Sequence, residues 1–84
     1  MNMNMDDNNT FQTSDFPLAT FLYAKGILLK AILDTPNDRH RKVFLFINPP
    51  EDLIKDFQSG NAFISVLAFT NAQQALKVAL RERQ

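Results

Sequence analysis

The sequence predicts a small α+β domain: an antiparallel two-stranded hairpin packed with three helices, in the order α-β-β-α-α. Apolar residues recur with helical spacing in three segments, and each segment has a capping residue at its start. Two short apolar runs, ILLKAILD and KVFLFIN, lie between the first and second of these segments. The chain has 84 residues, which is enough for one domain and one modest core.

The first ten residues, MNMNMDDNNT, are the least favourable part of the chain for folding. Methionine is their only apolar residue type, and they include two acids and four asparagines. Such a segment buries too little apolar surface to offset the entropy lost on ordering. We therefore expect a disordered tail over residues 1–10 and a single domain over residues 11–84.

The first helix is expected from Asp15 to Lys25. Ser14 or Asp15 can cap it, because both side chains can accept a hydrogen bond from a free N–H group of the first turn. Pro17 fits in that turn, where a missing N–H costs little. Gly26 follows the last helical residue and suits a left-handed cap.

Two strands are expected next, over residues 27–33 and 42–48. The eight residues between them, DTPNDRHR, are rich in turn formers, and Pro36 suits the second position of a turn. A parallel pair needs a connection of a dozen residues or more. The two strands should therefore form an antiparallel hairpin with an eight-residue turn.

The second of these strands is apolar on both faces. Phe44 and Phe46 point to one face, while Val43, Leu45 and Ile47 point to the other. An antiparallel strand with one solvated face normally alternates apolar and polar residues. Two interpretations remain open: helices cover both faces, or a second copy of the protein covers one of them.

Two further helices complete the chain. In NPPEDLIKDFQSG, Asn48 is the expected cap, Gly60 the expected stop, and the two prolines occupy the first positions. The last segment, ISVLAFTNAQQALKVALRERQ, should be capped by Ser65. Its buried stripe is expected to comprise Phe69, Ala72, Gln73, Leu76 and Leu80. Its apolar surface extends beyond that stripe to Leu67, Ala68, Ala75, Val78 and Ala79.

Several segments resemble a family of small bacterial and phage domains of unknown function. The segments are FQTSD at 11–15, LATFLYAKG at 18–26, VFLF at 43–46, LIKDFQSGNAFIS at 53–65 and FTNAQQALK at 69–77. The resemblance covers nearly everything after the tail and supports the predicted order of elements. It implies no activity, ligand or catalytic residue.

Composition narrows the possible functions. The chain has nine basic and nine acidic residues, so any nucleic-acid binding must come from a local patch. It contains no cysteine, which excludes disulfides, thiolate nucleophiles and zinc fingers. We expect a cytoplasmic protein without a membrane segment, because neither a secretion signal nor an apolar run of membrane-spanning length is evident.

Candidate catalytic groups are few. His40 is the only histidine, and it falls in the predicted turn. The acids Glu51, Asp52 and Asp56 fall in the first turns of the second helix, where they favour the helix dipole. We therefore predict no enzymatic activity, no cofactor, no metal site and no small-molecule substrate. Thr13 and Asp15 are the remaining polar pair: one should act as a cap, and the other could hold a neighbouring element or contact a partner.

The strongest candidate site is the basic segment that ends the predicted turn. Phosphate binding favours several cations on one exposed element. The candidate nucleic-acid contacts are Lys30, Arg39, His40, Arg41 and Lys42. Solvated turns are commonly charged as well, and the chain has no tryptophan to serve as a stacking platform for bases.

Two functions follow from the sequence. The first is a non-enzymatic interaction module, either a homo-oligomer or an adaptor to a protein partner. It would use the edges of the sheet or the additional apolar surface of the last helix. The alternative is an accessory protein that contacts nucleic acid through the basic turn.

Overall fold

The computed structural model describes residues 9–36 and 38–82, apart from the side chains of Arg39 and His40. It confirms a compact α+β domain with three helices and an antiparallel sheet. In chain order the elements are β1 (Thr10–Thr13), α1 (Phe16–Ala24), β2 (Leu29–Thr35), β3 (Asp38–Ile47), α2 (Glu51–Ser59) and α3 (Val66–Glu82).

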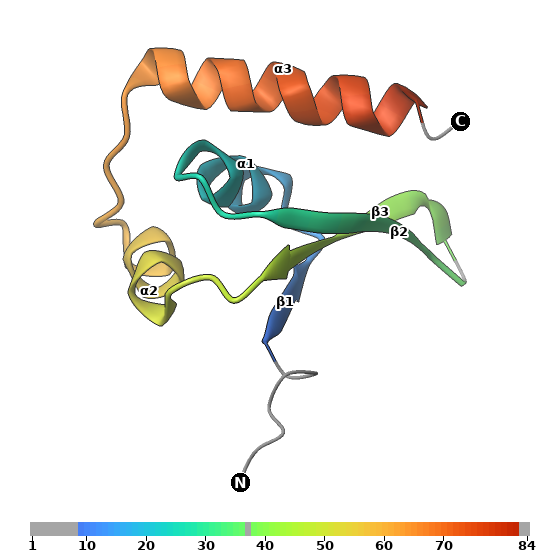
Figure 1. Ribbon diagram of the computed structural model, residues 1–84, viewed down its shortest axis with the longest axis horizontal. Helices are drawn as coiled ribbons and strands as arrows, with labels where there is room; N and C mark the ends of the chain where they lie inside the picture. Colours follow the sequence, from blue (N-terminus) through green and yellow to red (C-terminus); the bar gives the residue numbers. More distant parts are fainter. Residues whose placement is uncertain (1–8, 37, 83–84) are drawn as a thin grey trace, which may run out of the picture.

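The sheet has three strands, so a sheet of two strands and the order α-β-β-α-α were wrong, while the predicted antiparallel hairpin forms part of the sheet. Strand β1 precedes the first helix and pairs antiparallel with β3, which places β3 in the centre of the order β1-β3-β2 (Figure 1). Phe11 lies opposite Phe46 in this pairing and packs against the core. With four residues and one large apolar side chain, β1 is too short for its periodicity to be recognised.

The hairpin of β2 and β3 is longer than predicted, and its turn is shorter. The strands were expected over residues 27–33 and 42–48, but β2 continues to Thr35 and β3 begins at Asp38. Pro36 lies between the two strands, and the expectation for Asn37 lies outside the described residues. The eight-residue turn was therefore wrong, and the basic segment belongs to β3.

A side chain explains why the strands extend so far. The hydroxyl of Thr35 donates to the carbonyl of Asp38 at 2.6 Å and lies 3.3 Å from the carbonyl of Arg41. These contacts hold the start of β3 against the end of β2. The longer loop was predicted from the number of turn-forming residues alone, without the hydrogen bonds of the Thr35 side chain.

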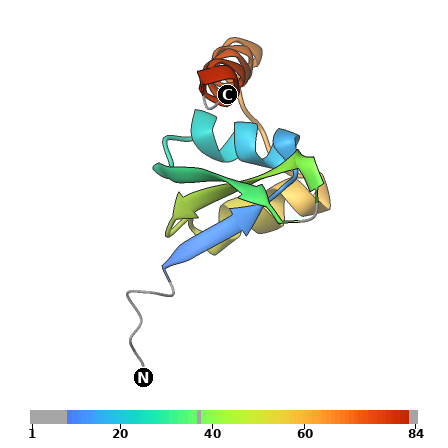
Figure 2. The same cartoon turned by 90° about the vertical axis from the view of Figure 1, so that its right-hand side faces the viewer.

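Helix α1 begins and ends where the sequence predicts. Asp15 is the N-cap, and its carboxylate accepts from the N–H of Leu18 at 3.1 Å. Pro17 lies in the first turn, and Gly26 follows the helix with a φ of 89°, in the left-handed region. Helix α1 lies on one face of the sheet, and α3 runs over α1 on its far side (Figures 1 and 2).

The core lies between α1, the sheet and α3. Phe44 is 3% exposed and Phe46 is fully buried, which confirms the predicted Phe face of β3. Burial of such rings is the main source of stability in a small domain. The buried cluster comprises Leu18, Ala19, Phe21, Leu22, Ile32, Phe44, Phe46 and Leu76.

Helix α2 starts later than predicted. Asn48 was expected to cap it, but the N-cap position is Pro50 and no side chain caps this end. The N–H of Asn48 instead donates to the carbonyl of Asn9, and its φ of 45° turns the chain after β3. Asn48 therefore ends the strand rather than starting the helix. Gly60 ends α2 in the left-handed conformation, as predicted.

The two C-terminal helices attach to α1. The rings of Phe21 and Phe57 lie 5.6 Å apart between centroids, which holds α2 beside α1. The hydroxyl of Ser65 accepts from the N–H of Ala68 at 3.0 Å at the start of α3, which confirms the predicted cap. Leu76 on α3 is buried in the core.

Candidate functional site

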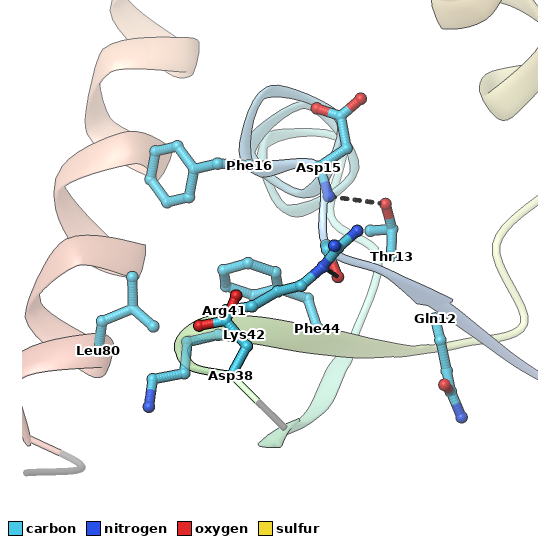
Figure 3. Close-up of a pocket in the computed structure, with 10 residues that line it drawn as sticks. Gln12, Thr13, Asp15, Phe16, Asp38, Arg41, Lys42, Phe44 and Leu80 are labelled. Atoms are coloured by element: carbon cyan, nitrogen blue, oxygen red, sulfur yellow. Dashed lines mark hydrogen bonds between the residues drawn. The ribbon is translucent and has the colours of Figure 1, made fainter. Parts of the chain in front are cut away.

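The described part of the basic segment borders an open cleft of about 820 Å³ (Figure 3). The cleft lies between the connection from β1 to α1 and the start of β3, with Leu80 of α3 at one side. Phe16, Phe44 and Leu80 supply its apolar surface. Its polar lining comprises Gln12, Thr13, Ser14, Asp15, Asp38, Arg41 and Lys42.

The charges in this cleft are balanced. Two acids, Asp15 and Asp38, line it together with two cations, Arg41 and Lys42. Arg41 extends toward the connection after β1, where its Nε donates to the hydroxyl of Ser14 at 3.2 Å, while Lys42 points the other way (Figure 3). The two cations do not converge on one ligand.

Lys42 already has a counter-ion. Its Nζ lies 2.5 Å from a carboxylate oxygen of Asp34, and the Lys42 side chain is 24% exposed. A paired and partly covered ammonium group is a poorer phosphate contact than a free one, because the competing carboxylate must be displaced. The neighbouring strand β2 thus neutralises part of the basic segment.

The other predicted nucleic-acid residues are distributed along β2 and β3. Asp34 pairs with Lys42 and Thr35 with Asp38, so the register shifts between these two pairs, and the residues from Arg39 to Arg41 form a bulge in β3. Lys30 is exposed on β2, at a second irregularity in the register. The backbones of Arg39 and His40 belong to β3, but their side chains lie outside the described residues. The prediction that placed Arg39, His40 and Arg41 in the hairpin turn was wrong, whereas Lys30 and Lys42 lie on strands as predicted.

The remaining polar candidates have structural partners. The hydroxyl of Thr13 accepts from the N–H of Asp15 at 3.0 Å, so the pair shapes the connection between β1 and α1. Glu51 and Asp52 lie in the first turn of α2, where acids favour the dipole. Over residues 9–36 and 38–82, no three His, Cys, Asp or Glu side chains gather as metal ligands.

A second candidate site is the face of the sheet that points away from α1. Side chains alternate along a strand, so Val43, Leu45 and Ile47 lie opposite the buried Phe44 and Phe46. Residues paired across strands share a face, which brings residues of β1 and β2 to the same side. This outer face consists of Thr10, Gln12, Leu28, Ala31, Leu33, Val43, Leu45 and Ile47.

Leu28 was not foreseen as part of this surface. It precedes β2, but its carbonyl accepts from the N–H of Ile47 at 2.9 Å, which continues the pairing of β3. Leu28 therefore lies beside Ile47 at one end of the outer face. Ala31 beside Leu45 and Leu33 beside Val43 complete two adjacent apolar columns.

The apolar side chains of the outer face lie outside the core. The hydrophobic cluster and the side chains packed against it include none of the six aliphatic residues of this face. Leu28 is 66% exposed, Leu33 41% and Ile47 36%. Ala31, Val43 and Leu45 are half-buried. Of the two interpretations left open by the sequence, helical cover on both faces is not found within residues 9–36 and 38–82.

A separate apolar surface lies where α3 begins. Phe63, Val66 and Leu67 are 82%, 81% and 71% exposed, and we call these three residues the α3-start patch. They fall within residues 57–76, a stretch of the sequence without any charged residue. Large exposed apolar side chains without nearby charge are typical of interaction surfaces.

Comparison with known proteins places the chain in a family without adding an activity. No helix in the described ranges is both long and apolar enough to cross a membrane. No curated protein and no solved structure matches the chain. A family model described as "Domain of unknown function (DUF5659)" matches residues 8–82. This agrees with the expected membership of a family of unknown function, while the bacterial or phage origin stays a prediction. The chain therefore belongs to the DUF5659 family.

Proposed function

We propose that this domain is a non-enzymatic interaction module that binds a protein surface through the outer face of its sheet. The partner is either a second copy of the chain or another protein. One observation carries the proposal: six aliphatic side chains form two adjacent columns on a sheet face that no helix of the described chain packs against. The expected cytoplasmic location is part of the same proposal.

The hydrophobic effect gives this observation its weight. Burying apolar surface contributes roughly 25 cal/mol per Å². An antiparallel sheet with one face on the core usually has polar residues on the other. Strand β3 instead keeps Val43, Leu45 and Ile47 on its outer side, next to Leu28 and Leu33. A partner that covers these residues would bury apolar surface that the fold leaves exposed, and this burial would favour binding.

The face of the sheet offers a better surface than its edges. Strand β1 has only four residues, and β2 has a register shift at Lys30. Short, bulged or charged edge strands discourage the addition of another strand. The sequence suggested the edges and the last helix as interaction surfaces. The structure supports the outer face as the principal surface and the α3-start patch as a second one.

Contact with nucleic acid is the alternative function. The observation in its favour is that Lys30, Arg41 and Lys42, with Arg39 and His40, lie on the adjacent strands β2 and β3. The pairing of Lys42 with Asp34 and the bond from Arg41 to Ser14 reduce the number of cations available to phosphates. The net charge of zero provides no additional attraction.

Site-specific photo-crosslinking in living cells tests the interaction function. A photoreactive amino acid replaces Leu33 on the outer face, and a matched variant carries it at the exposed Gln58 on α2. We expect covalent protein adducts from position 33 and few or none from position 58. The mass of each adduct, determined after digestion, identifies what was captured. An outer-face probe that captures no protein contradicts the proposed function.

A further inference from the structure

We propose that the surface covering the outer face is a second copy of the same chain, with the two sheets stacked face to face about a two-fold axis at Leu45. The inference rests on the interaction function proposed above and names its partner. Stacked sheets lie about 10 Å apart and fill the space between them with interdigitating apolar side chains. Such a dimer would be a sandwich with α1 and α3 of each copy on the outside.

The charge distribution favours a second copy. The eight outer-face residues are uncharged, and the exposed Lys30, at the register shift next to Ala31, is the one cation on this side of β2. A partner that recognises charge would find only Lys30 there, whereas a largely neutral apolar sheet matches the rest of the face. Another copy presents such a sheet, and two copies with no net charge do not repel each other.

The pattern of residues is also self-complementary. Leu45 lies in the middle row of the face, between Gln12 on β1 and Ala31 on β2. A two-fold axis that crosses the strands at Leu45 places each strand over its own copy. The Ile47 row then meets the Val43 row of the other copy. This arrangement puts apolar columns against apolar columns and the Thr and Gln side chains of β1 at the rim.

The size of the face sets the expected strength of the dimer. Three strands across and about seven residues along correspond to a footprint of roughly 14 by 20 Å. The two footprints together cover roughly 560 Å², so the accessible surface that the dimer buries lies at or below the roughly 1,000 Å² that a stable specific interface should exceed. We therefore expect a reversible dimer that dissociates on dilution rather than a permanent one.

Single-cysteine crosslinking tests this geometry. Because the native chain has no cysteine, one introduced thiol reports one position. At a concentration where the dimer is populated, a short bis-maleimide reagent should convert Leu45→Cys into a covalent dimer. The matched variant Leu67→Cys, in the α3-start patch, should remain monomeric. Crosslinking of Leu67→Cys without crosslinking of Leu45→Cys would overturn the proposal.

A pair of charge substitutions tests the same interface without a reagent. Leu33→Glu should raise the dimer dissociation constant by at least about 100-fold, because two carboxylates would lose water without gaining partners. Leu67→Glu should leave the dissociation constant within about threefold of the parent, since it lies outside the proposed interface. Sedimentation velocity measures both. Leu28→Glu, which lies before β2, repeats the test at a position outside the strand.

Failure of this inference can be distinguished from failure of the interaction function. If the parent stays monomeric at every concentration while position 33 captures a different protein in cells, the second-copy proposal is overturned and the interaction function stands. If position 33 captures only this chain, and Leu33→Glu abolishes both the adduct and the dimer, both are supported. If position 33 captures nothing and the parent is monomeric, both are wrong.

Discussion

The rings of Phe16 and Phe44 lie 6.0 Å apart between centroids, tilted by 55°, and join the first turn of α1 to the central strand of the sheet. Aromatic pairs at this distance stabilise the folded state beyond what the burial of their surface area contributes. Phe44 is 3% exposed, whereas its neighbour Val43 faces the opposite side of β3, outside the core. The inner side of β3 therefore stabilises the monomer, whereas its outer side is available for interactions.

Truncation on the two sides of β3 should separate these roles. Phe44→Ala should lower the free energy of unfolding by roughly 3–5 kcal/mol, the usual penalty for removing a buried ring. A domain of this size has little more stability than that, so the variant should be largely unfolded by circular dichroism. Val43→Ala is the matched control and should remain folded with a cooperative transition. A folded Phe44→Ala variant would show that the Phe face is not the core.

The cap of α1 provides a second test. Asp15→Ala should lower the free energy of unfolding by about 1 kcal/mol, because the N–H of Leu18 loses its acceptor. Ser14→Ala, at the other cap position suggested by the sequence, should change it by less than about 0.5 kcal/mol. Urea denaturation of the two variants compares them. A larger loss from Ser14→Ala than from Asp15→Ala would mean that the cap is assigned to the wrong residue.

The basic segment can be tested without affecting the fold. Replacing Arg39, Arg41 and Lys42 with Gln should leave stability nearly unchanged, because exposed ion pairs contribute little. If these cations contact phosphates, the triple variant should lose most nucleic-acid binding, and the salt dependence should weaken by up to about one unit of slope per contact. The parent must first bind DNA or RNA in about 50 mM salt, where electrostatic binding is strong. No binding by the parent would exclude the nucleic-acid alternative.

The segment before β1 should be dispensable for folding. Deleting residues 1–8 should change the melting temperature by no more than about two degrees, because their composition supplies little apolar surface to bury. The truncated chain keeps the carbonyl of Asn9, which accepts from Asn48, and all of β1. Differential scanning calorimetry of the two chains makes the comparison. A large drop in melting temperature would show that the segment packs on the domain.

Local patterns in the sequence predicted the helices and the Phe face well. Capping by Asp15 and Ser65, and the stops at Gly26 and Gly60, depend on residues adjacent in the chain, and the structure has each of them in that role. The burial of Phe44 and Phe46 follows from alternation along one strand. Such features depend on local geometry and need no knowledge of distant partners.

Features that depend on distant contacts were not predicted. Strand β1 exists because β3 offers it a partner more than thirty positions away, as in the pairing of Phe11 with Phe46. Asn48 has the side chain of a cap, yet its N–H bonds to Asn9 across the sheet. The sequence predicted only the β3 part of the outer face, because Leu28 and Leu33 belong to this face through their register with β3.

The central claim is that the outer face is open in a single chain and binds the same face of a second copy. Methyl NMR spectra recorded over a wide dilution series test it most directly. We predict concentration-dependent shifts for the methyl groups of Leu28, Leu33 and Leu45, with those of the buried Leu22 and Leu76 unchanged. Shifts confined to Val66 and Leu67, or outer-face methyl groups that do not respond to concentration, would contradict the claim.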